Sequence, residues 1–119
     1  PIHSLEKTKR LIEEVNSDYL SIILDPTNLI TLENYKTQPE ILEEAFNLFG
    51  EKINAVHVKD FTIENSKIKP VNLFEGLMQV EKIIDIIEKH KPGNFIVIEQ
   101  TKDEAIKTAV EKLNLILKK

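Results

Sequence analysis

Three short runs of mostly apolar, often β-branched residues divide the chain, and each has the length of one β-strand. They cover residues 19–24, 53–58 and 95–98. Their apolar residues are nearly continuous and do not alternate with polar ones, which is typical of strands buried on both faces of a parallel sheet. The pattern therefore predicts three parallel strands, each covered on both sides.

Between and around these runs, apolar residues recur at helical spacing, with charged residues on the opposite face. This spacing predicts four helices. Three begin at the expected N-caps Ser4, Thr37 and Thr101, whose hydroxyl oxygens can accept from unpaired backbone N–H groups, and one covers about 75–90. Gly50 is expected to end the second helix in a left-handed conformation.

The remaining segments are expected to be irregular: a loop at 26–36, a polar loop at 61–74 and a turn at 91–94. The predicted element order is α-β-α-β-α-β-α. This alternation indicates the α/β class, with a parallel sheet and right-handed crossovers. A length of 119 residues fits one small domain and is too short for two ordinary ones.

A residue able to bind a metal or move a proton stands at the end of each predicted strand: Asp25, His57 and Glu99. Since the carboxyl ends of parallel strands lie on one side, where α/β folds place their sites, these side chains are expected to converge. Two carboxylates and an imidazole suit a divalent ion such as Mn²⁺, Mg²⁺, Co²⁺ or Zn²⁺. An ion beside a carboxylate base suits proton abstraction next to a carbonyl. Any one of these residues alone is more often a helix cap or a surface group, so only the combination predicts a site.

Other polar residues near these strand ends have two interpretations each. Asn28 could bind a substrate hydroxyl or form a local turn after the proline. Lys59 could meet a substrate oxygen, or Lys59 and Asp60 could pair with each other or with neighbours. His90 is explained by the dipole at the carboxyl end of a helix, and neither it nor His3 is assigned a catalytic role.

Composition excludes several classes of function. The net charge is −4, whereas nucleic-acid binding usually requires a basic patch. The absence of cysteine removes disulfides, thiolate zinc sites and cysteine nucleophiles. No apolar run has the length of a membrane span and no signal-peptide pattern opens the chain, so we expect no membrane contact and a cytoplasmic location.

Five segments, taken in this order and at this spacing, resemble a known family. They are Leu24-Asp25-Pro26-Thr27-Asn28, the helix at 38–49, Val56-His57-Val58-Lys59-Asp60, the segment 74–77 and Ile98-Glu99. The chain resembles the C-terminal part of the sugar phosphate isomerase/epimerase group, the xylose isomerase-like TIM barrels. The likeness extends over almost the whole chain, and its specificity comes from the combination of motifs.

The resemblance implies a metal site with four ligands at the ends of the last barrel strands. Asp25, His57 and Glu99 would be three of them, with Glu99 also one of two acid/base glutamates. The first glutamate should precede the opening helix, on a strand that this sequence does not contain. Two positions depart from the family pattern: Asn28 stands where related epimerases often have a histidine, and Phe74 stands where a glycine is expected.

The chain is therefore expected to be a single partial TIM-barrel domain, residues 1–119, with the last three strands and four helices. We expect the isolated chain to be inactive and to self-associate through exposed sheet edges. The complete protein would act on a sugar or sugar acid. One alternative is a non-enzymatic barrel remnant that serves as an interaction domain. Another is an AP endonuclease-type phosphodiesterase, which the shortage of histidines and the acidic charge oppose.

Overall fold

The computed structural model describes residues 5–92, 95–99 and 101–117. Ser4 and part of the expected turn at 91–94 lie outside the described residues. The helices are α1 (Leu5–Val15), α2 (Gln38–Phe49), α3 (Val80–His90) and α4 (Asp103–Leu117), and the strands are β1 (Ile22–Leu24), β2 (Ile53–Val58), β3 (Asp60–Glu64), β4 (Lys67–Val71) and β5 (Phe95–Ile98). Short 3-10 helices cover Pro26–Leu29, Tyr35–Thr37 and Gly50–Lys52.

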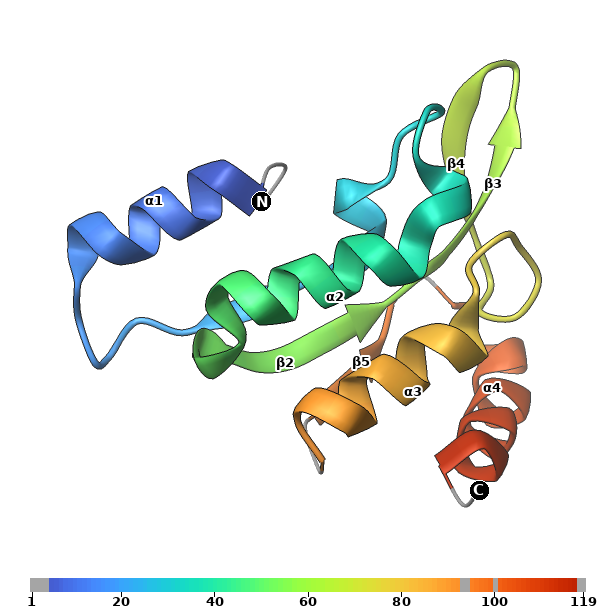
Figure 1. The fold of residues 1–119 in the computed structure, drawn as a ribbon. Helices are drawn as coiled ribbons and strands as arrows, with labels where there is room; N and C mark the ends of the chain where they lie inside the picture. Colours follow the sequence, from blue (N-terminus) through green and yellow to red (C-terminus); the bar gives the residue numbers. More distant parts are fainter. Residues whose placement is uncertain (1–4, 93–94, 100, 118–119) are drawn as a thin grey trace.

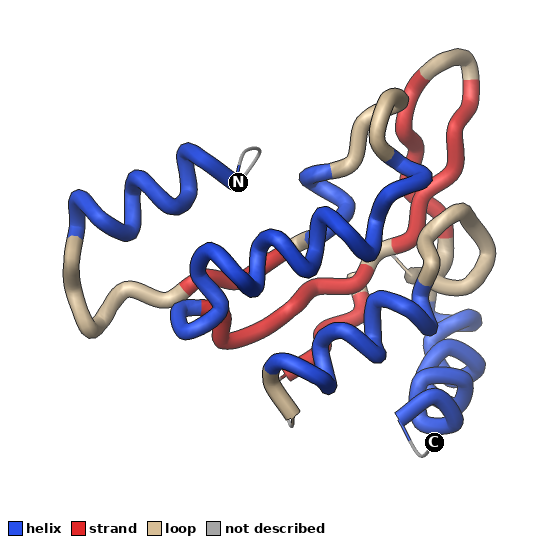
Figure 2. The backbone as a smooth tube through the Cα atoms, in the orientation of Figure 1, coloured by secondary structure: helices blue, strands red, loops and turns tan. Residues whose placement is uncertain are grey.

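The three predicted strands form one parallel sheet in the order β1-β2-β5 (Figures 1 and 2). The first strand is shorter than predicted: it begins at Ile22 and not at residue 19, and Tyr19 is exposed. Val56 in the central strand lies opposite Leu24 on one side and Ile96 on the other. The prediction of an α/β fold with a parallel sheet is confirmed. Because the strands are parallel, the carboxyl ends of β1, β2 and β5 all face the same end of the molecule.

The core lies between one face of this sheet and the helices α2 and α3, which run side by side in Figure 1 and contact each other. The sheet contributes side chains such as Leu24 and Val56, both fully buried. Each helix buries apolar residues at helical spacing: Leu42, Ala45, Phe46 and Phe49 in α2, and Val80, Ile83, Ile84 and Ile87 in α3. Among the described residues, no helix is long and apolar enough to cross a membrane.

The opposite face of the sheet is open, so the prediction of burial on both faces is wrong. Ile23 is 56% exposed and Val97 is 40% exposed. Strand register and alternation place Ala55 and His57 on this face with them. No described helix packs there, because α2 and α3 both lie on the other side.

The segment expected as a polar loop at 61–74 contains an antiparallel hairpin, so that prediction is also wrong. Strands β3 and β4 pair with Ile63 opposite Ile68. The turn residues Asn65 and Ser66 have φ angles of 52° and 60°. Positive φ at both central residues is the geometry of the tight turns that match strand twist, and asparagine tolerates it well. Asn65 was thus the one residue in the sequence that indicated this turn, although the charged residues around it are also typical of a loop.

Helix ends also differ from expectation. The third helix begins at Val80 and not near residue 75, because residues 72–79 form a separate loop. Gly50 has a φ of −56° and continues into a 3-10 turn instead of adopting a left-handed cap. Thr37 makes no capping bond to α2, because its hydroxyl donates to the Asn34 carbonyl. Phe74 has a φ of 74°, a left-handed backbone conformation that favours glycine, and the resemblance leads to the expectation of glycine at this position.

Candidate metal centre

Three side chains from three strand ends meet at the carboxyl end of the sheet. Asp25 follows β1, His57 lies in β2, and Glu99 follows β5. Each offers one ligand atom, and these atoms lie within 4.8 Å of one another. The His57 Nδ1 and Glu99 Oε1 atoms are 2.6 Å apart, with the two side chains 24% and 34% exposed. The structure therefore brings together the residues that strand order alone had placed on one side.

Asp25 is held by the chain turn that follows it. Its Oδ1 atom accepts from the backbone N–H of Thr27 at 3.1 Å and so caps the first 3-10 helix. Pro26 starts that helix, where its missing N–H group is not needed. The Thr27 hydroxyl donates to the Lys59 carbonyl at 2.6 Å, which ties this turn to the end of β2.

Lys59 is the cation of the site. Its Nζ atom lies 3.1 Å from Asp25 Oδ2 and donates to Asn28 Oδ1 at 3.1 Å. Lys59 thus pairs with a neighbour and not with Asp60. This bond uses the side-chain oxygen of Asn28, Oδ1, and leaves the side-chain N–H₂ group of Asn28 as a donor. The local turn that was one of two interpretations of Asn28 is formed instead by the Asp25 carboxylate, which accepts from Thr27 N–H.

Asp60 is completely buried and does not belong to the candidate site. Its Oδ1 atom accepts from the backbone N–H groups of Phe61 and Met78, both at 2.8 Å. Its Oδ2 atom accepts from Gly76 N–H at 3.1 Å. A Cβ atom at Gly76 would stand 2.2 Å from the Phe61 carbonyl oxygen, so only glycine allows this close approach. The motif residue Asp60 therefore fixes the loop before α3.

The hairpin that the sequence reading missed forms one wall of a cavity beside the site. This cavity has a volume of about 310 Å³, and its lining includes Thr27, Asn28 and Lys59 from the site. Ile68 and Pro70 of β4 line it as well. Polar groups next to the three candidate ligands thus face a space that can hold a small molecule.

The three ligand groups fit a divalent ion chemically. Metal–oxygen and metal–nitrogen bonds of about 2.0–2.2 Å place ligands on opposite sides of an ion roughly 4 Å apart. The ligand atoms lie within 4.8 Å of one another, and an ion would replace the direct 2.6 Å contact between His57 Nδ1 and Glu99 Oε1. Two carboxylates and one imidazole, without sulfur, suit Mn²⁺, Mg²⁺, Co²⁺ or Zn²⁺.

His90 lies away from this site in a separate cluster at the end of α3. Its Nε2 atom is 2.8 Å from Glu43 Oε2, and its ring stacks on Phe46 with centroids 4.9 Å apart. The hydrogen bond from His90 is the main reason that the pKa of Glu43 lies below its ordinary value of 4.5, and Lys89 contributes in the same direction. The contacts with Glu43 and Phe46 therefore explain why a histidine stands at this helix end, in addition to the helix dipole. His3 lies outside the described residues.

Comparisons with known proteins agree with this fold. The sequence model of the family described as "Xylose isomerase-like TIM barrel" matches residues 1–118. A crystal structure of a xylose isomerase domain protein from Planctomyces limnophilus is similar, with a TM-score of 0.74 and 23% sequence identity. The likeness covers 95% of this chain and 41% of that chain, so this chain spans less than half the length of that protein. Comparison with curated proteins finds no match. The chain belongs to the xylose isomerase-like TIM barrel family.

Proposed function

We propose that this chain carries part of the active site of a metal-dependent sugar or sugar phosphate isomerase or epimerase. The observation that carries the proposal is the convergence of Asp25, His57 and Glu99, whose ligand atoms lie within 4.8 Å of one another. Family membership supports chemistry on a small molecule. The reaction would move a proton at the carbon next to a carbonyl group.

Each residue of the site would have a distinct role. Asp25, His57 and Glu99 would hold the divalent ion, which supplies Lewis-acid stabilisation of the enediolate charge when bound. Glu99 would also exchange a proton with the substrate carbon, because its carboxylate is the more exposed of the two at 34% against 11% for Asp25. Asn28 would donate from its free N–H₂ group to a substrate hydroxyl.

Lys59 would act as a counter-charge in two ways. Without an ion, its ammonium group compensates Asp25 at 3.1 Å. When an ion takes over that carboxylate, the same ammonium can turn to a substrate oxygen in the neighbouring cavity, which Lys59 lines. This exchange of partners would keep the charge of the site balanced in both states.

The 119-residue chain is expected to turn over no sugar on its own. Its described residues supply three ligands and one acid/base carboxylate to this site, whereas the resemblance implies four ligands and two glutamates. We expect measurable but weak ion binding, and catalysis only when the remaining strands of the barrel are present. The isomerase activity is thus a proposal about the complete protein.

Calorimetric titration with Mn²⁺ and Co²⁺ tests the proposal directly. His57→Ala and Glu99→Gln should each lower ion affinity about tenfold or more, because each removes a ligand or its charge. His90→Gln is the matched control, since His90 lies in the Glu43 cluster, and it should leave affinity unchanged. In the complete protein, Glu99→Gln should also abolish turnover. Equal affinity in the wild type and His57→Ala would refute the metal site.

A further inference from the structure

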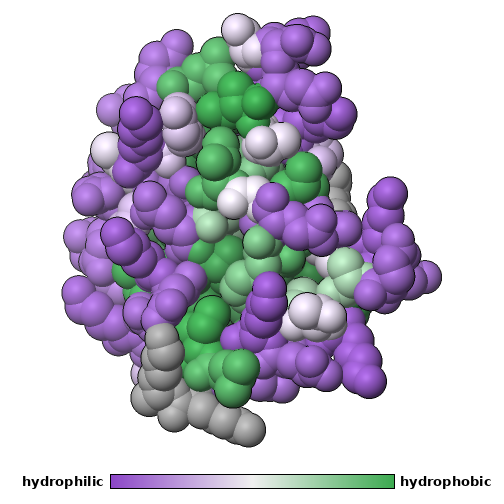
Figure 3. Space-filling model, turned by 90° about the vertical axis from the view of Figure 1, so that its right-hand side faces the viewer, coloured by the Kyte–Doolittle hydropathy of each residue, from purple (hydrophilic) through white to green (hydrophobic). Residues whose placement is uncertain are grey.

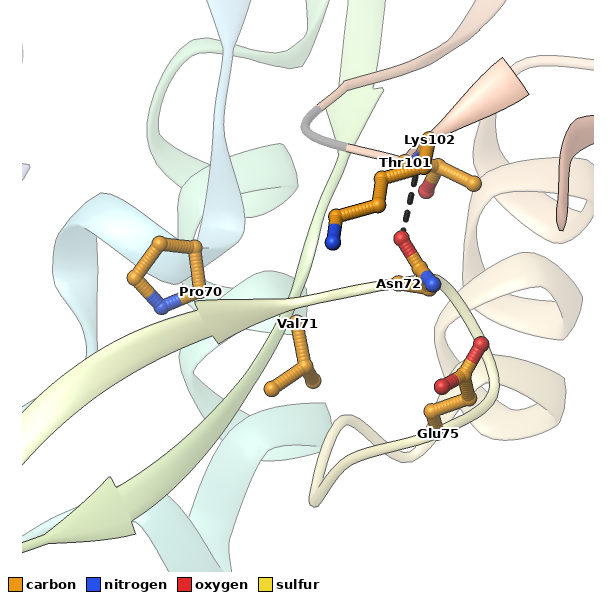
Figure 4. A pocket seen from close by; sticks show the side chains of 6 residues that line it. All are labelled: Pro70, Val71, Asn72, Glu75, Thr101 and Lys102. Carbon is orange, nitrogen blue, oxygen red and sulfur yellow. Dashed lines mark hydrogen bonds between the residues drawn. The ribbon is translucent and has the colours of Figure 1, made fainter. Parts of the chain in front are cut away.

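A second cavity, of about 520 Å³, lies between the end of β4 and the segment that leads into α4 (Figure 4). Its walls come from two parts of the chain that are distant in sequence. The lining residues are Pro70, Val71, Asn72, Glu75, Thr101 and Lys102.

Hydrogen bonds between the two walls fix the shape of this cavity. Leu73 N–H donates to the Thr101 hydroxyl at 3.0 Å, and Lys102 N–H donates to the Asn72 side-chain oxygen at 2.9 Å. Within the first wall, Glu75 N–H donates to the Asn72 carbonyl at 3.0 Å. These bonds therefore fix the side chains of Asn72 and Thr101 in the absence of a ligand.

Three polar groups remain for a ligand. Lys102 and Glu75 form no ion pair within the described part of the chain. The oxygen of Asn72 is used by Lys102 N–H, so its N–H₂ group is left as a donor. Figure 4 shows the amine end of Lys102 extending over the hollow between it and Pro70. The cavity thus offers one cation, one neutral donor and one carboxylate acceptor.

The cavity is close to the candidate metal centre. Thr101 follows Glu99 by two residues, and its hydroxyl lies 3.4 Å from the Glu99 carbonyl. A chain advances at most about 3.6 Å per residue, so the Cα atom of Lys102 lies within roughly 11 Å of that of Glu99. Pro70 lines both this cavity and the cavity beside the metal centre, so the two cavities are neighbours.

We infer that this cavity binds the anionic end of a polyhydroxylated substrate whose reacting carbon lies at the metal centre. Lys102 pairs with the carboxylate or phosphate of the substrate, Asn72 donates to one of its oxygens, and Glu75 accepts from a hydroxyl group. This inference rests on the proposed function and narrows its substrate class to sugar acids or sugar phosphates, at the expense of neutral sugars.

The test compares glucose, gluconate and glucose phosphorylated at its terminal carbon. Binding is followed through the backbone amide resonances of Leu73 and Lys102 in the isotope-labelled chain. An exposed ion pair contributes up to about 1 kcal/mol, so an anionic ligand should bind about fivefold more tightly than glucose. The stronger of the two anionic ligands identifies the group as carboxylate or phosphate.

Lys102→Gln should abolish the preference for anions, because it removes the ammonium and keeps the backbone N–H bond to Asn72. Lys107→Gln removes an equal charge from an exposed position in α4 and should keep the preference. Equal binding of glucose and both anions, no binding of any of them, or an unchanged preference in Lys102→Gln would overturn the inference.

Parallel titration with Mg²⁺ separates this inference from the proposed function. If Glu99→Gln and His57→Ala leave Mg²⁺ affinity unchanged while the anion preference persists, the metal centre is refuted and the anion cavity stands. If those variants lose Mg²⁺ binding while anions show no preference, the cavity is refuted and the metal centre stands.

Discussion

Replacing the buried carboxylate of Asp60 by an amide should destabilise the fold far more than its small change in shape suggests. Both carboxylate oxygens accept from backbone N–H groups: Oδ1 from Phe61 and Met78, and Oδ2 from Gly76. In Asp60→Asn, an amide oxygen can replace only one of these atoms. The amide N–H₂ group then faces a backbone donor, which leaves a buried N–H group without an acceptor.

The expected cost follows from these bonds. A hydrogen bond to a charged acceptor contributes about 1.5–3 kcal/mol, and an unsatisfied buried donor costs about 1–3 kcal/mol. These two costs overlap for the same group, so the free energy of unfolding should fall by about 3 kcal/mol. At roughly 4 °C per kcal/mol for a domain of this size, the melting temperature should fall by about 12 °C.

Urea unfolding at neutral pH, followed by circular dichroism, measures this effect. Asp85→Asn is the matched control, because Asp85 lies exposed on α3 and its change should stay within about 0.5 kcal/mol. The slope of unfolding free energy against urea should be the same in both variants if the native fold is kept. A loss below about 1 kcal/mol in Asp60→Asn would show that the loop before α3 does not depend on this carboxylate.

Two further predictions concern the acid stability and the assembly of the chain. Because the hydrogen bond from His90 lowers the pKa of Glu43 below 4.5, the folded state gains stability at pH values above 4.5 and loses it as the pH falls through the folded-state pKa. The melting temperature of Glu43→Gln should therefore lie below that of the wild type at neutral pH and approach it in acid; a constant difference would contradict this assignment. The two edge strands β1 and β5 expose Ile23 and Val97, so light scattering should show self-association as concentration rises, and Ile23→Lys should reduce it. A monomer at every concentration would exclude this association.

Most of the sheet could be predicted from the sequence, because apolar runs identify strands and alternation with helices implies parallel pairing. The position of Asp25, His57 and Glu99 followed from topology alone, since parallel strands end on the same side. Their distances, and the bonds from Asp25 to Thr27 and Lys59, could not follow from the pattern. Those depend on how the loops after the strands close over the sheet edge.

The errors have a common physical origin in partners that are distant in sequence. The hairpin was not predicted because its apolar pair, Ile63 and Ile68, forms only across two strands. In the sequence each isoleucine is a single apolar residue among polar and charged ones. The late start of α3 has a similar cause. The N–H groups of Gly76 and Met78, in the loop before this helix, donate to the carboxylate of Asp60 in β3. Helical spacing near residue 75 is a weak local preference, and these two bonds to a buried carboxylate override it.

The open face of the sheet links these errors to function. Apolar runs in β1 and β5 indicated burial on both sides, and the described residues cover only one. His57 lies on the open face, in register with Val97, and its side chain is 24% exposed. Apolar residues point to both faces of the sheet, and an imidazole and two carboxylates stand at the end of the uncovered face. This is the pattern expected of the interior of a barrel. The same exposure that favours self-association of the isolated chain therefore also leaves His57 accessible from the open face of the sheet.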